Sequence, residues 1–230
     1  MNQKKFLAIG GAVAALAAGA AILAVPAVAG AVGTTVTVRV EGVSRTLLAP
    51  KTVKTHGGWI TKGGTPVGQC PATSAAGALD VATKGRWGAK YSSGLGIEVL
   101  SILGEKHSFT SKYFWGIWIN NRFAQLGACA LKLRKGTQLL FGAIPVAAAA
   151  DNALLLRAPS SATVGHPFTV KVTYLPAKGL AKPVAGARVG GAVTDSQGIA
   201  TITPKSKGTL FLRATNPSYI RSVFARVRVS

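Results

Sequence analysis

The sequence is poor in the residues that carry out most enzyme chemistry. Its 230 residues include only 6 Asp plus Glu, 3 His and 2 Cys. The carboxylates are scattered rather than paired for general acid and base work, and the histidines are not clustered. Zinc-protease, nucleophile-elbow and phosphate-loop motifs are missing. We therefore predict a protein that is not an enzyme, without a metal site or a required cofactor, although distant residues can converge in a fold.

The shortage of acidic residues leaves a large positive charge. Against 6 Asp plus Glu stand 27 Lys plus Arg, which gives a formal net charge of +21. This imbalance predicts attraction to polyanions such as nucleic acid, acidic cell-wall polymers or anionic lipid headgroups. The alternative is that the charge keeps an exported protein soluble.

An apolar N-terminal segment indicates export. Lys4 and Lys5 precede an apolar run from Phe6 to Val25, and a small-x-small cleavage signal follows, so residues 1–29 are predicted to be a secretory signal peptide. An uncleaved membrane anchor is the alternative, because about 20 apolar residues span a bilayer. We predict a secreted protein, extracellular or cell-wall associated, that is not an integral membrane protein after cleavage and has no nucleic-acid partner.

Cys70 and Cys129 are predicted to form a disulfide bond, because exported thiols meet an oxidising environment. Closing a loop of about 60 residues would stabilise the fold by about 4 kcal/mol on the chain-entropy model. Two free, buried thiols are the alternative.

Alternation of apolar and polar residues predicts a mainly β protein with two domains at 30–146 and 154–230, joined by a linker at 147–153. The second domain, with about six short strands and a turn at 195–198, is expected to be an immunoglobulin-like β-sandwich. In the first domain we expect strands at 34–40, 45–53 and 96–103, a polar loop at 84–96, and one helix at 73–83. Thr73 or Ser74 is expected to cap that helix.

The stretch 113–141 is the most informative part of the chain. Its first strand carries aromatic residues on both faces, and Asn120-Asn121 predicts a two-residue turn after it. Leu131 to Arg134 is expected to be the next strand. A turn at Lys135-Gly136 then leads to a returning strand at 138–141.

A family resemblance rests on this stretch. The sequence is similar to the C-terminal domain of transcobalamin and intrinsic factor, and more closely to bacterial secreted domains of unknown function that share this transcobalamin-like β-grasp module. The matching residues are Phe114-Trp115, Trp118, Asn120, Gly127-Ala128 and Lys135-Gly136. The family's Asn-Gly is Asn120-Asn121 here, and its Gly-Asp turn is Gly136-Thr137. The resemblance covers roughly residues 34–145 and implies an α+β, β-grasp-like domain. Residues 186–200 resemble bacterial immunoglobulin-like modules, which usually serve as spacers.

The resemblance implies a ligand site on the aromatic strand, where Phe114, Trp115 and Trp118 offer flat apolar contact and Asn120 a polar handle. Trp87, in the expected loop, is a further ligand-binding candidate, although a Trp at the edge of a core is the commoner case. In transcobalamin-like proteins the ligand is a corrinoid, and a helical barrel, absent here, supplies the other half of the site. Another small molecule, a glycan or a peptide is therefore an equal alternative to cobalamin.

Two functions follow from these observations. The first is a secreted or cell-surface, non-catalytic ligand-binding protein. The alternative is a structural cationic protein of the cell envelope that associates with acidic wall polymers.

Overall fold

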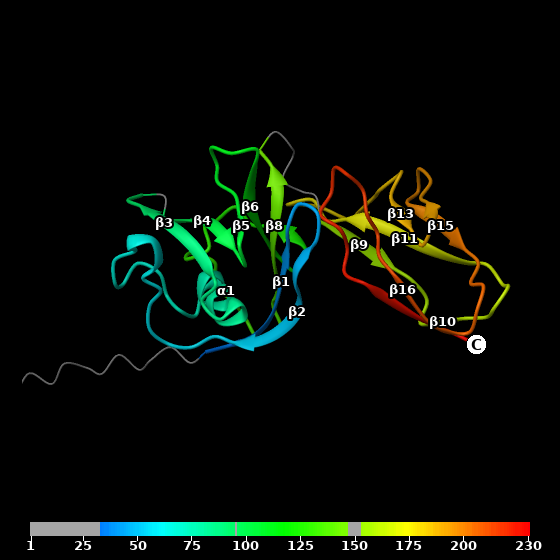
Figure 1. Cartoon of the computed structure of the whole chain (residues 1–230), viewed down its shortest axis with the longest axis horizontal. Coiled ribbons are helices and arrows are strands. Elements are labelled where there is room, and N and C mark those ends of the chain that lie inside the picture. The colour runs from blue at the N-terminus through cyan, green and yellow to red at the C-terminus, as the bar shows by residue number, and fades with distance from the viewer. Residues whose placement is uncertain (1–32, 95, 147–152) are drawn as a thin grey trace, which may run out of the picture.

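The computed structural model describes residues 33–94, 96–146 and 153–230. In the described residues, strands dominate and α1 (Ala75–Thr83) is the one α-helix, which confirms the prediction of a mainly β protein with a single helix. The strands group into two bodies that lie side by side along the long axis of the molecule (Figure 1). The predicted signal peptide and most of the predicted linker lie outside the described residues.

The first body contains a mixed five-stranded sheet, ordered β2-β1-β8-β6-β7. Its central pair, β1 and β8, is parallel, and its other pairs are antiparallel. Pro50 lies inside β2, where it is tolerated because β2 is at the edge of the sheet and one side of it needs no ladder bonds. The strands are β1 (Thr35–Glu41), β2 (Thr46–Lys54), β6 (Tyr113–Ile119), β7 (Arg122–Phe123) and β8 (Gln138–Pro145).

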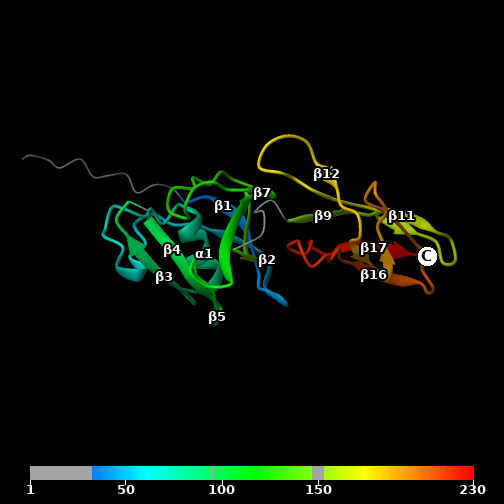
Figure 2. The same ribbon diagram turned by 90° about the horizontal axis from the view of Figure 1, so that it is seen from above.

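A second sheet of three strands, together with α1, forms the end of the molecule away from the other body (Figure 2). It consists of β3 (Trp87–Ser92), β4 (Gly96–Ile102) and β5 (Glu105–Lys106), and a short 3-10 turn, η1 (Lys62–Gly64), precedes the helix. The prediction of a loop at 84–96 was therefore wrong for Trp87–Ser92, about half of that stretch. Antiparallel pairing with β4 holds the glycine-containing β3 in an extended conformation, which local composition does not show.

The start of α1 is not capped as predicted. Ser74 occupies the N-cap position, but its side chain makes no capping hydrogen bond and its hydroxyl is buried without a partner in the described residues. The loop that crosses the helix start supplies acceptors instead: the N–H groups of Ala75 and Ala76 donate to the carbonyls of Leu131 and Ala128, at 3.2 and 3.1 Å. Backbone carbonyls of a loop distant in sequence thus replace the side-chain cap that was predicted.

The disulfide between Cys70 and Cys129 is formed, as predicted, and anchors this loop beside the helix. Gly77 allows a different close contact, between the helix and the segment just before it, because a side chain at this position would clash with the backbone carbonyl of Ala72. The glycine that weakens the helix by its propensity is therefore required by its packing.

The predicted turn at Asn120-Asn121 is confirmed. Both residues have positive φ, +50° and +65°, and they join β6 to β7 as a two-residue hairpin loop. The strand predicted at 131–134 was wrong, since these residues form only an isolated bridge, from Lys132 to the residue before α1. The returning strand, β8, pairs with β6 on one side and with β1 on the other.

The second body has two main sheets around one core. One sheet is ordered β10-β17-β16, and the other has β11 pairing with β9, β12 and β15. Val172, Leu212 and Val227 come from both sheets and are buried together, an arrangement that fits the expected sandwich. The strands are β9 (Leu154–Arg157), β10 (Ser161–Ala162), β11 (Phe168–Tyr174), β12 (Lys182–Pro183), β13 (Arg188–Val189), β14 (Ala192–Val193), β15 (Ile199–Ile202), β16 (Gly208–Leu212) and β17 (Ala225–Val229).

The predicted turn at 195–198 is also present. The carboxylate of Asp195 accepts hydrogen bonds from the N–H groups of Gln197 and Ile199, and Gly198 has φ +72°. This is the side-chain-to-backbone bonding that favours aspartate at the first position of a turn.

The two bodies meet at an apolar cluster. Trp118, Leu140 and Ile144 from the first body pack with Ala153 and Ile220 from the second. Ala153, placed in the linker by the sequence, is buried here and forms a bridge with Ile220. We call this contact region the domain junction.

Candidate functional site

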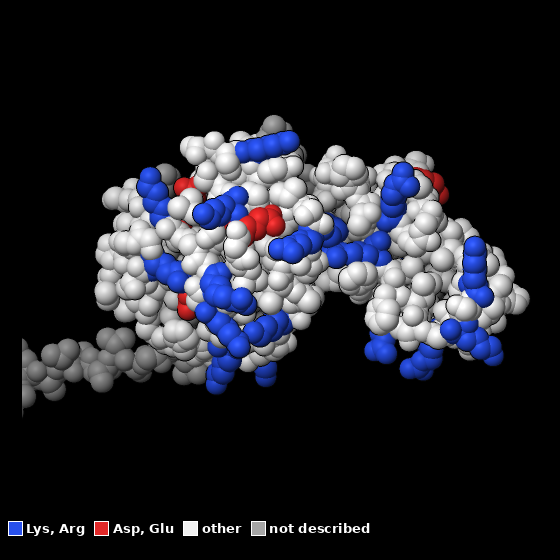
Figure 3. All heavy atoms as spheres, in the orientation of Figure 1, with Lys and Arg blue, Asp and Glu red and all other residues white. Residues whose placement is uncertain are grey.

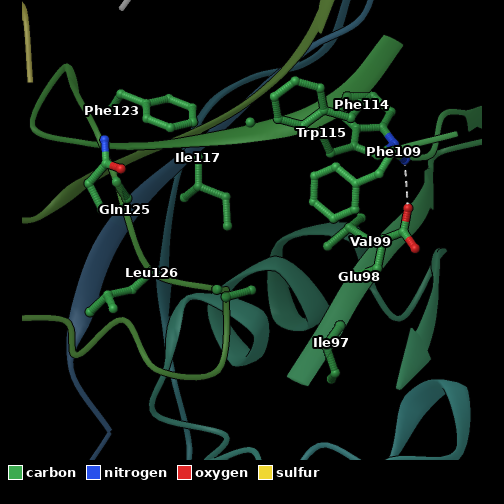
Figure 4. Close-up of a pocket in the computed structure, with 14 residues that line it drawn as sticks. Ile97, Glu98, Val99, Phe109, Phe114, Trp115, Ile117, Phe123, Gln125 and Leu126 are labelled. Carbon is green, nitrogen blue, oxygen red and sulfur yellow. Dashed lines mark hydrogen bonds between the residues drawn. The ribbon is translucent and has the colours of Figure 1, made fainter. Parts of the chain in front are cut away.

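A groove of about 240 Å³ follows an unpaired edge of β6 (Figure 4). β7 pairs only with Trp118 and Ile119, so the preceding part of this edge has no neighbouring strand among the described residues. Phe114 and Trp115 point to opposite faces of the pleated strand, yet both line the groove, which must therefore run along the strand edge. Residues 97–99 of β4 form the facing wall. We call this feature the β4–β6 groove.

Two strongly exposed apolar side chains line the groove. Phe109 is 60% exposed and Leu126 is 58% exposed. The ring of Phe109 lies 5.2 Å from that of Phe114, centroid to centroid. The backbone N–H of Phe109 donates to the carboxylate of Glu98 at 2.7 Å, which holds its loop against β4. An apolar surface kept exposed in this way is typical of a contact site.

The edge of β6 also offers backbone hydrogen-bonding groups. The carbonyls of Tyr113 and Ile117 accept bonds from Ser108 and Ala124, at 3.1 and 2.8 Å, on the side away from β8. Trp115 lies midway between them, and the alternation of strand geometry points its N–H and carbonyl to the same edge. Within the described residues these two groups have no backbone partner. They lie on the edge of β6 that borders the groove.

The structure brings two of the predicted ligand-binding residues to the groove, Phe114 and Trp115. Trp115 is mostly buried, and its ring lies 5.0 Å from that of His107, so it acts as a wall of the groove rather than an exposed platform. The imidazole of His107 is held in turn by Glu105, at 2.7 Å.

The other predicted ligand-binding residues lie elsewhere. Trp118 is fully buried in the domain junction and meets Phe123 edge-on at 5.3 Å. Asn120 is in the exposed turn, where its carboxamide oxygen accepts a bond from the N–H of Gln138. Trp87 is buried, and its indole N–H donates to Asp80 at 2.7 Å. Each side chain has a structural role at its position.

Sequence reasoning missed Phe109 and Leu126. Phe109 belongs to the connection between β5 and β6, a polar segment in which a lone Phe between Ser108 and Thr110 was the available signal. Leu126 lies in a loop that was expected to join two strands. Neither residue lies in a stretch with the alternation of apolar and polar residues that indicates a strand.

A second polar centre lies in the domain junction. Glu41 is fully buried at the end of β1, and its carboxylate binds Arg213 at 2.6 Å, Arg221 at 3.2 Å and Arg39 at 3.5 Å. The hydroxyl of Thr46 donates to the same carboxylate. Arg213 and Arg221 come from the second body, more than 170 positions away in sequence. Because of this separation, no local pattern of residues indicates the cluster.

The cluster holds three guanidinium groups and one carboxylate. Burial lowers the pKa of Arg39 to about 10, even though Glu41 raises it. Burial also lowers the pKa of Arg213, which is less deeply covered. The arginine cluster therefore has two positive charges in excess, in a region where water screens them weakly.

In the part of the chain that the structure describes, no three His, Cys, Asp or Glu side chains gather in a way that would hold a metal ion. No helix among the described residues is long and apolar enough to cross a membrane.

No protein-family model matches this chain, and no curated protein matches it significantly in sequence. The transcobalamin-like and immunoglobulin-like resemblances therefore rest on the quoted residues and stay predictions.

Proposed function

We propose that this chain is a secreted, non-catalytic binding protein that holds an apolar part of its ligand in the β4–β6 groove. The observation that carries the proposal is the exposed pair Phe109 and Leu126 beside an aromatic-lined, unpaired strand edge. Apolar lining with a few polar groups is the usual composition of a ligand site. Here the polar groups are the side chains of Glu98 and Gln125, together with the backbone N–H and carbonyl of Trp115.

The size of the groove limits what can enter it. Its volume of about 240 Å³ is below the roughly 300–1,000 Å³ of pockets that enclose drug-sized ligands. A small apolar group fits inside, whereas only one edge of a corrinoid would do so. If cobalamin is the ligand, most of the corrinoid lies outside the groove, and another part of the protein or a partner protein encloses it.

Intrinsic tryptophan fluorescence and calorimetry with cyanocobalamin test the proposal first. The informative variant is Phe109→Ser/Leu126→Ser, because it removes exposed apolar area and leaves the Trp115 wall in place. Phe211→Ser is the matched control, since Phe211 on β16 is also 60% exposed but lies outside the groove. Saturable binding that falls about tenfold or more in the groove variant, for a loss of roughly 1.5 kcal/mol or more of apolar contact, would identify a corrinoid-binding site.

A negative result with cobalamin leads to a second probe, the apolar dye 8-anilinonaphthalene-1-sulfonate. Dye binding that the groove variant loses and Phe211→Ser keeps would retain the groove as the site of another ligand. If neither probe binds, or if the two variants weaken binding equally, the proposal is wrong.

The distribution of charge favours a second candidate function, a cationic protein of the cell envelope. Basic side chains are spread over both bodies and acidic ones are few on the face shown (Figure 3). Retention on isolated cell walls would then fall steeply with salt, because screening shortens to about 8 Å at physiological ionic strength. Retention that does not change with salt would contradict this function, and the groove variant should leave retention unchanged.

A further inference from the structure

A cavity of about 330 Å³ opens at the domain junction, beside the arginine cluster. Its lining combines Val43, from the loop after β1, with residues of the second body. The polar lining residues are Arg188, Thr215, Asn216, Tyr219 and Arg221. Among the described residues no carboxylate lines it, although Arg221 is bound to the carboxylate of Glu41.

The lining offers hydrogen-bond donors with few acceptors to match. Arg188 is exposed, and its guanidinium has no hydrogen-bond or ion-pair partner in the described residues. Arg221 uses its Nε and Nη2 atoms to bind Glu41 and the carbonyls of Gly42 and Val43, and its Nη1 is not among the bonded atoms of the described residues.

The remaining polar groups of the lining can also donate. The amide oxygen of Asn216 is occupied by the N–H of Ser218, which leaves the amide nitrogen toward other partners. The hydroxyl of Tyr219 is a donor at neutral pH, as in any tyrosine, and burial, with a smaller contribution from Tyr174, raises its pKa further.

The charge behind the cavity favours an anion. Arg39, Arg213 and Arg221 have side chains less than one-fifth exposed, and Glu41 balances only one of them. Backbone carbonyls satisfy several of their N–H groups but carry no net charge. A negative group held between Arg188 and Arg221 would offset part of the excess at a place where solvent does so poorly.

We propose that this cavity is a binding site for a small molecule carrying an oxyanion, a phosphate or a carboxylate, held between Arg188 and Arg221. Guanidinium groups bind both oxyanions through paired N–H donors. The cavity is larger than a bare phosphate requires, which leaves room for the group that carries it. Because Arg221 also contacts Glu41, Gly42 and Val43, the ligand would bind to a residue that joins the two bodies.

Calorimetry on the full mature chain tests the site with three probes at constant ionic strength: inorganic phosphate, glycerol phosphate and acetate. Saturable binding at millimolar concentration is expected for at least one, and the preferred probe distinguishes a phosphate from a carboxylate ligand. Arg188→Gln should weaken binding about tenfold or more, as the loss of a charged hydrogen-bond donor predicts. Its unfolding temperature should stay unchanged, because the side chain has no partner to lose.

Arg226→Gln is the control, because it removes the same charge from the exposed face of β17. It should change the affinity less than twofold. Equal weakening in both variants would show attraction to overall charge and overturn the site. Absence of saturable binding by all three probes would overturn it as well, and neither outcome depends on the β4–β6 groove.

Discussion

Trp115 and Trp118 lie three positions apart on β6 and therefore on opposite faces of it. Trp115 forms a wall of the β4–β6 groove, next to His107, and the exposed Phe109 lines the same groove. Trp118 is enclosed in the domain junction with Ile220 of the second body. One strand thus supports two different surfaces, one open to a ligand and one closed by a domain. Because both faces of β6 carry aromatic residues, the sequence pattern does not show which face lines the groove and which is covered by the second body.

Neighbouring glycines show how closely the junction face is packed. Gly116 and Gly142 pair directly across β6 and β8, and the ring of Trp118 lies against both. A side chain at either position would come within 2.9 Å of that ring. The groove has no comparable constraint on Phe109 or Leu126, which are mostly exposed. Substitutions on the two faces should consequently differ in what they change, stability on one and binding on the other.

The largest effect is expected from Glu41→Gln. This substitution removes the buried carboxylate that binds Arg39, Arg213 and Arg221, and breaking a buried ion pair costs about 3–5 kcal/mol. Urea unfolding followed by tryptophan fluorescence measures the loss. The double variant Glu41→Gln/Arg213→Gln should recover part of the lost stability. It brings the excess positive charge of the cluster from three back to two, the value in the unmodified protein. A further loss in the double variant would show that charge is not the cause.

A slightly smaller loss is expected from Trp118→Ala. Truncating a fully buried Trp costs about 3–5 kcal/mol, and here the lower part of that range is expected because the indole N–H is buried without a partner in the described residues. Ligand binding in the groove, assayed on the fraction that remains folded, should be unchanged. Loss of binding in the folded protein would mean that the two faces of β6 are coupled.

The smallest effect on stability is expected from Phe109→Ser/Leu126→Ser. Both side chains are exposed, so the free energy of unfolding should change by no more than about 0.5 kcal/mol per substitution. The same urea experiment measures it. A loss of several kcal/mol would show that these residues belong to the core, and the groove would then lose its main evidence as a binding surface.

Local chemistry made several parts of the fold predictable. Alternation in β1, β6 and β11 marked strands, because the side-chain period of two is a property of the extended backbone itself. Asn120-Asn121 and Asp195 marked turns for reasons contained in those residues. The disulfide followed from the expected compartment and the presence of two cysteines. The same local pattern correctly placed Phe114 and Trp115 in a strand, β6.

Long-range packing decided the rest. β3 became a strand because β4 is available to pair with it, and α1 is capped by carbonyls of a loop more than 50 residues away. Burial of Trp118 required a second domain to cover it.

The sequence by itself determined the mainly β fold, the single helix, the turns and the excess of positive charge, since these depend on neighbouring residues or on composition. Tertiary structure alone decided which aromatic residues line the groove and which close the junction. It also gathered Arg39, Arg213 and Arg221 around Glu41. Such convergence depends on how strands distant in sequence are brought together, and no local pattern of residues records that.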